Sequence, residues 1–138
     1  MRYLHRAALL SERAGDRRFQ QRIGIGRTQY LVLRTIADAD EPPSQQVIAE
    51  QLSLTKGAVS RHIDTATRRG CLTVGSAASR REHALALTSD GRALVDRGRV
   101  VQREYERLGD EQLSPDDIAA TVRTLRTLCE LLESEVRQ

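Results

Sequence analysis

The sequence contains no tryptophan, and aromatic residues make up only 3% of its 138 positions. A hydrophobic core must therefore be built mainly from leucine, valine, isoleucine and alanine. No apolar run approaches the roughly 18 residues that a membrane-spanning helix needs, and the N-terminal segment lacks the apolar centre of a signal peptide. These features predict a cytoplasmic protein with no membrane partner.

Residues that could support chemistry are also scarce. The two cysteines, Cys71 and Cys129, lie far apart and do not have the spacing of metal ligands. In a reducing cytosol both are expected to be thiols rather than a disulfide. The sequence has no nucleophile–base signature and no glycine-rich phosphate loop. It therefore predicts neither an enzyme nor a bound cofactor or metal.

The net charge of +3 is unevenly distributed along the chain. Residues 55–81 carry six basic residues and one acidic residue, a net charge of +5, whereas residues 101–138 carry five basic and nine acidic residues, a net charge of −4. A local basic surface attracts phosphates and releases counterions when it binds nucleic acid. An isolated charge run would more simply be a solvated face, so this interpretation depends on the motif that accompanies it.

Residues 44–88 predict a helix, a tight turn, a second helix and a β-hairpin, which is the order of a winged helix-turn-helix. Ser44 is a plausible N-cap of the first helix, whose buried side is expected to hold Val47, Ile48, Ala49 and Leu52. The second helix is expected to run from an N-cap at Thr55 to Arg69, with Gly70 as its stop.

The second helix of this pair has two chemically different faces. Val59, Ile63 and Ala66 recur at helical spacing and should pack inward. A recognition helix presents short polar or cationic groups to the major groove. The candidate DNA-binding residues in this segment are Ser44, Thr55, Lys56, Gly57, Ser60 and Arg61.

The predicted hairpin pairs residues 71–74 with residues 84–87 around a small, polar tip. Arg80 and Arg81 lie on this tip and are also candidate DNA-binding residues, because a narrow minor groove favours inserted arginine. The alternative role of these two arginines is that of solubilising loop charges.

Helices are also predicted on both sides of the motif. Residues 1–20 carry a loose apolar stripe of Leu4, Ala7, Ala8 and Leu10, and residues 27–38 form a second helix. A further helix is capped at Ser89–Asp90, and the last begins at Ser114–Pro115. Apolar residues in this last helix form a heptad seam, which predicts packing on partner helices; they are Ile118, Val122, Leu125, Cys129, Leu132 and Val136.

The whole chain resembles the multiple-antibiotic-resistance regulator (MarR) family of winged-helix repressors. The resemblance is strongest in residues 48–61, and it continues through Arg68-Arg69-Gly70, Arg80-Arg81 and Leu87-Thr88-Ser89-Asp90-Gly91. It implies a mainly α fold with a β-hairpin wing, in which residues 27–88 bind DNA and residues 1–26 and 89–138 form a helical dimerisation region. It further implies a homodimer on a pseudo-palindromic operator, and a repressor released by a small aromatic or phenolic effector.

The sequence departs from the family pattern at several positions. Ser79 stands where the family usually has an aspartate that orients a wing arginine, and Ser53 stands where glycine is usual. Ala66 replaces a larger aliphatic residue, and Cys71 takes a place often held by an aliphatic residue.

Two alternatives to effector-controlled repression remain open. Cys71 is a candidate redox residue, since the nearby cations Arg68 and Arg69 would favour its thiolate. The alternative role of Cys71 is that of a small buried hydrophobe in the first strand. The chain could also be an architectural DNA-binding protein that responds to no effector.

Overall fold

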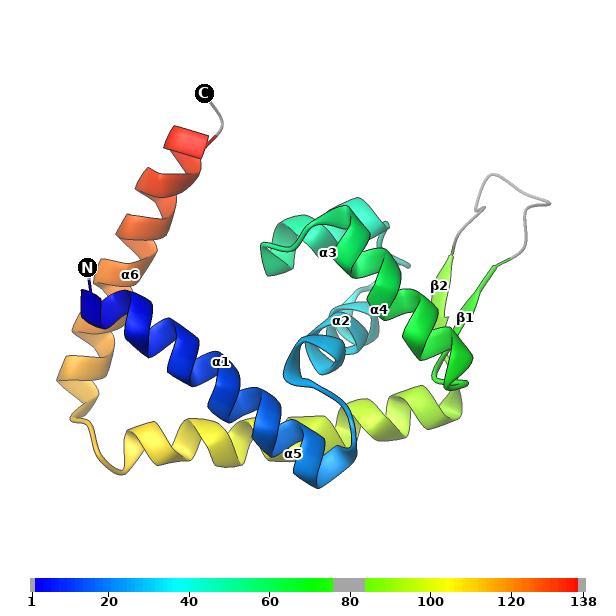
Figure 1. Cartoon of the computed structure of the whole chain (residues 1–138), viewed down its shortest axis with the longest axis horizontal. Helices are drawn as coiled ribbons and strands as arrows, with labels where there is room; N and C mark the ends of the chain where they lie inside the picture. Colours follow the sequence, from blue (N-terminus) through cyan, green and yellow to red (C-terminus); the bar gives the residue numbers. More distant parts are fainter. Residues whose placement is uncertain (1, 76–83, 137–138) are drawn as a thin grey trace. The chain divides into compact units, whose positions relative to one another are not determined.

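The computed structural model describes residues 2–75 and 84–136. Contacts divide the chain into two compact units, residues 1–102 and residues 103–138, and each is described by itself. The described elements are α1 (Arg2–Ile23), α2 (Arg27–Asp38), α3 (Gln45–Leu52), α4 (Lys56–Arg68), β1 (Leu72–Val74), β2 (Leu85–Leu87), α5 (Ser89–Asp110) and α6 (Pro115–Val136). This order confirms the predicted mainly α, winged-helix fold (Figure 1).

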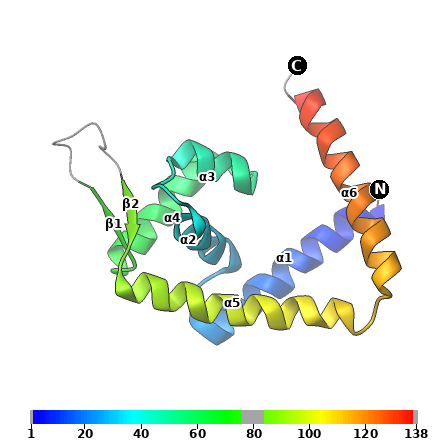
Figure 2. The same cartoon turned by 180° about the vertical axis from the view of Figure 1, so that it is seen from behind.

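Helix α2 is the centre of the first unit, where it packs against α1, α3, α4 and β2 (Figures 1 and 2). Tyr30, Val32 and Leu33 of α2 are almost completely buried. The ring of Phe19 from α1 lies 4.7 Å from the ring of Tyr30, centroid to centroid. This aromatic pair fixes the C-terminal part of α1 on α2, in a chain with few other aromatic side chains.

Only the C-terminal part of α1 is anchored in this way. Gly15 and Phe19 are its buried residues, and the helix ends before Gly24, which adopts a left-handed φ of +74°. The apolar stripe predicted near the N-terminus is present on the helix but is exposed in the single chain, with Leu10 51% exposed. An exposed apolar stripe of this kind is available to a partner.

The hairpin is short and antiparallel, and it pairs Leu72 with Leu87, Thr73 with Ala86 and Val74 with Leu85. Leu72, Leu85 and Leu87 are buried and attach the base of the hairpin to the core. The hairpin tip, residues 76–83, lies outside the described residues.

Two local predictions are wrong. Val47 was expected on the buried side of α3 but is 41% exposed. Successive helical residues are separated by about 100°, so Val47 turns outward when Ile48 and Ala49 both face the core. The cap of α5 is also not Ser89–Asp90: the Thr88 hydroxyl accepts a hydrogen bond from the Gly91 amide at 3.1 Å, and the helix begins at Ser89.

The second unit contains the end of α5 and the whole of α6. The Ser114 hydroxyl accepts a hydrogen bond from the Asp117 amide at 3.1 Å, and Pro115 takes the first helical position, as predicted. No residue of α6 is buried in the single chain. In the part of the chain that the structure describes, no helix is long and apolar enough to cross a membrane.

Candidate nucleic-acid interface

The turn between α3 and α4 is defined by side-chain caps at both helix starts. The Ser44 hydroxyl accepts a hydrogen bond from the Val47 amide at 3.2 Å, and the Thr55 hydroxyl accepts one from the Ala58 amide at 3.1 Å. Both predicted N-caps are therefore confirmed. Each hydroxyl keeps its own hydrogen, so Ser44 and Thr55 can still donate to an oxygen outside the protein.

Ser53 ends α3 in the left-handed conformation, with φ +52° and ψ +41°. Among the described residues, it is the one non-glycine residue with a positive φ. This conformation reverses the chain within two residues, and the Leu54 amide closes the turn by donating to the Ala49 carbonyl at 2.9 Å. The serine thus occupies a position at which glycine would be unstrained.

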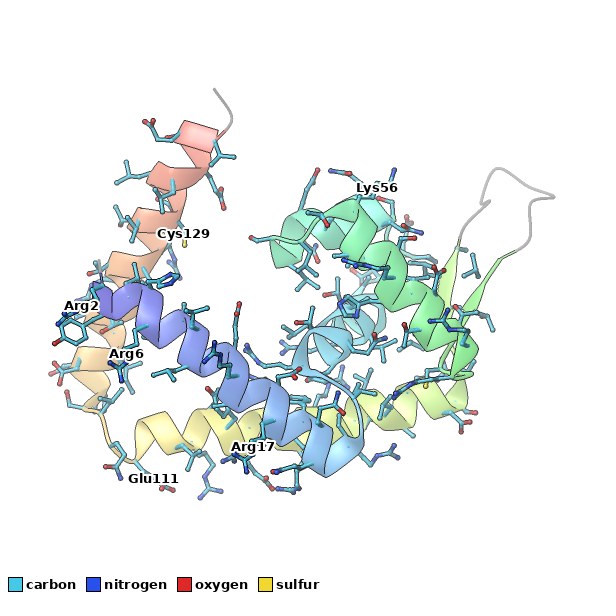
Figure 3. All side chains as sticks on the ribbon, in the orientation of Figure 1. Arg2, Arg6, Arg17, Lys56, Glu111 and Cys129 are labelled. Carbon is cyan, nitrogen blue, oxygen red and sulfur yellow. The ribbon has the colours of Figure 1, made fainter. Side chains whose placement is uncertain are left out.

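Helix α4 separates buried from exposed residues as its sequence predicts. Val59, Ile63 and Ala66 are at most 3% exposed. Lys56, Gly57 and Arg61 are exposed, and Ser60 is half-buried. The candidate residues of α4 therefore share the part of the helix that the core leaves free, and Figure 3 shows the labelled Lys56 side chain extending outward from the start of the helix.

The N-terminal end of α4 is suited to an anion. The helix has no acidic residue in its first turn, and unpaired backbone amides give a helix N-terminus a partial positive charge. Lys56 adds a full positive charge at the same end. A methyl group added at Gly57 would meet no atom within 4 Å, so the backbone is open to close approach there.

The remaining basic residues near α4 differ in what they contact. The Arg68 guanidinium donates to the Thr65 hydroxyl at 3.3 Å and stays on the surface of α4. The Arg69 guanidinium donates to the Gly24 carbonyl at 3.1 Å and so ties the end of α4 to the turn after α1. The predicted wing residues Arg80 and Arg81 lie outside the described residues. Ser79 lies outside them as well.

Cys71 lies at the base of the hairpin and is 8% exposed. Its thiol is 3.9 Å from the Arg69 carbonyl oxygen, to which it can donate a weak hydrogen bond. Its burial is that of a packed core residue. Cys129 on α6 is instead exposed in the single chain. Within the described residues, no group of three or more metal-ligating side chains comes together.

Two residues outside the predicted site hold α4 in place. The Gln29 side-chain amide of α2 donates to the His62 carbonyl at 3.0 Å, and the ring Nδ1 of His62 lies 2.7 Å from Oε1 of Gln29. Burial, and then the positive charge of Arg61, lowers the pKa of His62 below its ordinary value. No sequence pattern indicates this pair, because the two residues are 33 positions apart.

Comparison with known protein families gives a match for the segment that contains α2, α3, α4 and β1. Residues 23–82 match the family model described as MarR family. The winged-helix segment belongs to the MarR family. The predicted resemblance is confirmed for this segment, and DNA binding in transcription regulation is the general function that the match assigns to it. No match was found among curated proteins.

Several solved structures share the fold over nearly the whole chain. A MarR/EmrR family transcriptional regulator from Acinetobacter sp. ADP1 superposes with a TM-score of 0.85 at 22% identity, over 96% of this chain and 93% of that one. S. aureus MepR in complex with DNA gives 0.81 at 21% identity, over 94% of each chain. CouR from Rhodococcus jostii RHA1, bound to p-coumaroyl-CoA, gives 0.76 at 22% identity, over 91% and 88%.

Proposed function

We propose that this MarR-type protein is a homodimeric, sequence-specific repressor that binds a pseudo-palindromic operator and is released by a small-molecule effector. The observation that carries the proposal is the division of α4 into two faces. Val59, Ile63 and Ala66 are buried, while Lys56, Gly57 and Arg61 are exposed at or near the helix N-terminus. A helix held by one face with small and cationic residues on the other is suited to the major groove.

The residues of this surface have different proposed roles. Arg61 reads a base edge or clamps a phosphate, since its guanidinium can donate two parallel hydrogen bonds. Lys56 and the amides at the start of α4 bind phosphate. Ser44 and Thr55 donate their hydroxyl hydrogens to the DNA backbone from the first turns of α3 and α4. Ser60 adds a hydroxyl and Gly57 permits close approach.

The wing supplies a second contact in this proposal. Arg80 and Arg81 enter the minor groove beside the half-site that α4 reads. The proposal for these two arginines rests on their place between β1 and β2, and on the MarR assignment of residues 23–82.

The second part of the proposal is a homodimer whose helical region comprises residues 1–26 and 89–138, with residues 27–88 as the DNA-binding region. Val122, Leu125 and Leu132, on the seam of α6, are 49%, 38% and 51% exposed in the single chain. A row of exposed apolar residues at heptad spacing is characteristic of a helix that packs on a partner. A second copy would bring a second α4 to the next half-site, about one turn of DNA away.

The third part is control by an effector. CouR, which shares the fold, was solved bound to p-coumaroyl-CoA, and this ligand supports a small aromatic or phenolic effector for this chain. Oxidation of Cys71 is the alternative mode of control. The burial of that thiol at the hairpin base supports packing as its first role.

Selection of bound fragments from a random duplex pool tests the DNA-binding proposal. We expect enrichment of a two-fold symmetric sequence, which the protein binds as a dimer with an affinity that falls steeply with salt. Equal retention of all fragments would favour an architectural DNA-binding protein. Retention of none would overturn the proposed function.

A further inference from the structure

The contact between α2 and α4 contains one directional element, the pair Gln29–His62. Gln29 is 7% exposed, and His62 is half-buried on the flank of α4. Two hydrogen bonds join the residues, one to the backbone of His62 and one to its ring. Side chain and main chain of the same α4 residue are therefore held by one amide group of α2.

The chemistry of these groups fixes where the protons lie. The carbonyl oxygen of His62 can only accept, so the NH2 group of Gln29 must face it. Oε1 of Gln29 then faces Nδ1 of His62, and because an amide oxygen also only accepts, Nδ1 must carry the ring proton. In neutral His62 the other ring nitrogen, Nε2, is unprotonated and takes no part in the pair.

Val59, Ile63 and Ala66 determine which face of α4 is buried. Contacts between apolar side chains are less directional than hydrogen bonds, so the Gln29–His62 pair adds a finer constraint on the rotation of α4 about its own axis. The Gln29–His62 hydrogen bonds are directional, and His62 is the immediate neighbour of Arg61. The rotation at which these bonds form therefore contributes to the direction in which Arg61 leaves the helix.

Helix α2, which carries Gln29, is itself held in place by close packing. Next to Gln29, the ring of Tyr30 is buried and contacts the ring of Phe19 on one helix and the backbone of Gly98 on another. A Cβ atom added at Gly98 would lie 2.3 Å from the Tyr30 ring, which shows how closely α5 approaches α2. The Gln29 side chain thus projects from a helix fixed by α1 and α5.

We infer that Gln29 is a positioning residue for DNA recognition, which orients the recognition helix α4 through Nδ1–H and the carbonyl of His62. The inference rests on the proposed role of α4 in binding DNA. Apparent affinity falls in proportion to the fraction of molecules whose helix is correctly oriented. Loss of the pair should therefore weaken operator binding by about tenfold, the effect of one or two hydrogen bonds on that equilibrium.

Three variants test the inference on the duplex that the wild-type protein selects. In His62→Asn the side-chain amide can place an N–H where Nδ1–H was, whereas in His62→Gln the amide reaches the position of Nε2. Gln29→Met keeps the volume of Gln29 and removes both hydrogen bonds. We expect His62→Asn to stay within about threefold of wild type, and His62→Gln and Gln29→Met each to lose about tenfold.

The reverse order, with His62→Gln active and His62→Asn weak, would show that His62 acts through Nε2 and would overturn the inference. Equal affinity of Gln29→Met and wild type would overturn it as well. A uniform loss from misfolding is recognised by circular dichroism and thermal unfolding of the same samples. Wild-type protein that selects no duplex would instead refute the proposed function.

A measurement without DNA tests the pair itself. The 15N chemical shifts of the histidine ring distinguish the two neutral tautomers, and we expect the Nδ1–H form at His62 in the wild-type protein at pH 8. Gln29→Met should lose this preference. The Nε2–H form in the wild-type protein would contradict the hydrogen bonding from which the inference starts, whether or not the protein binds DNA.

Discussion

Gly91, in the first turn of α5, lies directly against the backbone carbonyl of Cys71. A Cβ atom at Gly91 would be 2.0 Å from the Cys71 carbonyl oxygen and 2.9 Å from the carbonyl carbon. The Thr88 amide donates to the same oxygen at 3.1 Å, and the Thr88 hydroxyl donates to the Gly70 carbonyl at 2.7 Å. Thr88 and Gly91 together join the start of α5 to the turn between α4 and β1.

Gly91→Ala should destabilise the protein, because neither the helix nor the carbonyl can move away cheaply. We expect a loss of about 1–3 kcal/mol in the free energy of unfolding, as for other overpacked sites, measured by urea denaturation. Gly109→Ala is the matched control on the same helix: its added Cβ would meet nothing within 4 Å. The control should be neutral or slightly stabilising. Equal stability of both variants would contradict the close contact.

Ser53→Gly should stabilise the protein. Ser53 has a φ of +52°, a conformation that costs a residue with a Cβ atom about 1–2 kcal/mol, while glycine adopts it freely but loses more entropy on folding. The net gain should be about 0.5–1 kcal/mol, visible as a higher Tm. Ser53→Ala, which keeps the strain, should show no gain. A lower Tm for Ser53→Gly would show that the serine side chain itself stabilises the turn.

The titration of His62 should make stability depend on pH. Burial and the charge of Arg61 lower the pKa of His62 in the folded protein, while the unfolded chain keeps a value near 6.5. As pH falls below about 6.5, the unfolded state binds the proton first, so the free energy of unfolding decreases until the folded pKa is passed. Above the unfolded pKa of about 6.5 the contribution is fully present.

His62→Asn cannot titrate and should lack this part of the pH dependence. Urea denaturation of wild type and His62→Asn at pH 7.5 and pH 5.5 would measure this difference. Wild type should lose more stability than His62→Asn between these values. An identical loss in both proteins would show that the His62 pKa is the same in the folded and unfolded states.

Leu132→Glu should convert the proposed dimer into a monomer. Leu132 is on the seam of α6 and is 51% exposed in the single chain, and burying a carboxylate in an apolar interface is costly. Thr127→Glu is the control, since residue 127 lies on the opposite side of the same helix. Light scattering should give about 31 kDa for wild type and Thr127→Glu, and about 15.5 kDa for Leu132→Glu. A monomeric wild type would refute the dimer.

The sequence predicted those elements that depend on local patterns. The N-caps at Ser44, Thr55 and Ser114 follow from side-chain chemistry within one turn, and the inward face of α4 follows from helical spacing. Thr88 was missed as a cap because Ser89 and Asp90 are equally good cap residues beside it. In the folded chain the Thr88 hydroxyl also donates to the Gly70 carbonyl, and this contact depends on the tertiary structure.

Sequence patterns do not predict contacts between residues that are far apart in the chain. Gln29 and His62 carry no common motif. In the sequence Arg69 is one of six basic residues between positions 55 and 81, whereas in the structure it donates to the Gly24 carbonyl and has a structural role. The family pattern indicates glycine at position 53. The left-handed backbone conformation of Ser53 gives the physical reason for that preference. Such relations depend on which elements meet in space rather than on spacing along the chain.

The affinity of Arg61→Ala for the selected duplex tests the central proposal, DNA recognition by α4, most directly. Fluorescence anisotropy at fixed salt should show at least a tenfold loss, about 1.4 kcal/mol or more, with an unchanged oligomeric state. Arg123→Ala on α6 removes the same charge from an exposed site and should leave the affinity nearly unchanged. Equal affinities of Arg61→Ala, Arg123→Ala and wild type would contradict the assignment of α4 as the recognition helix.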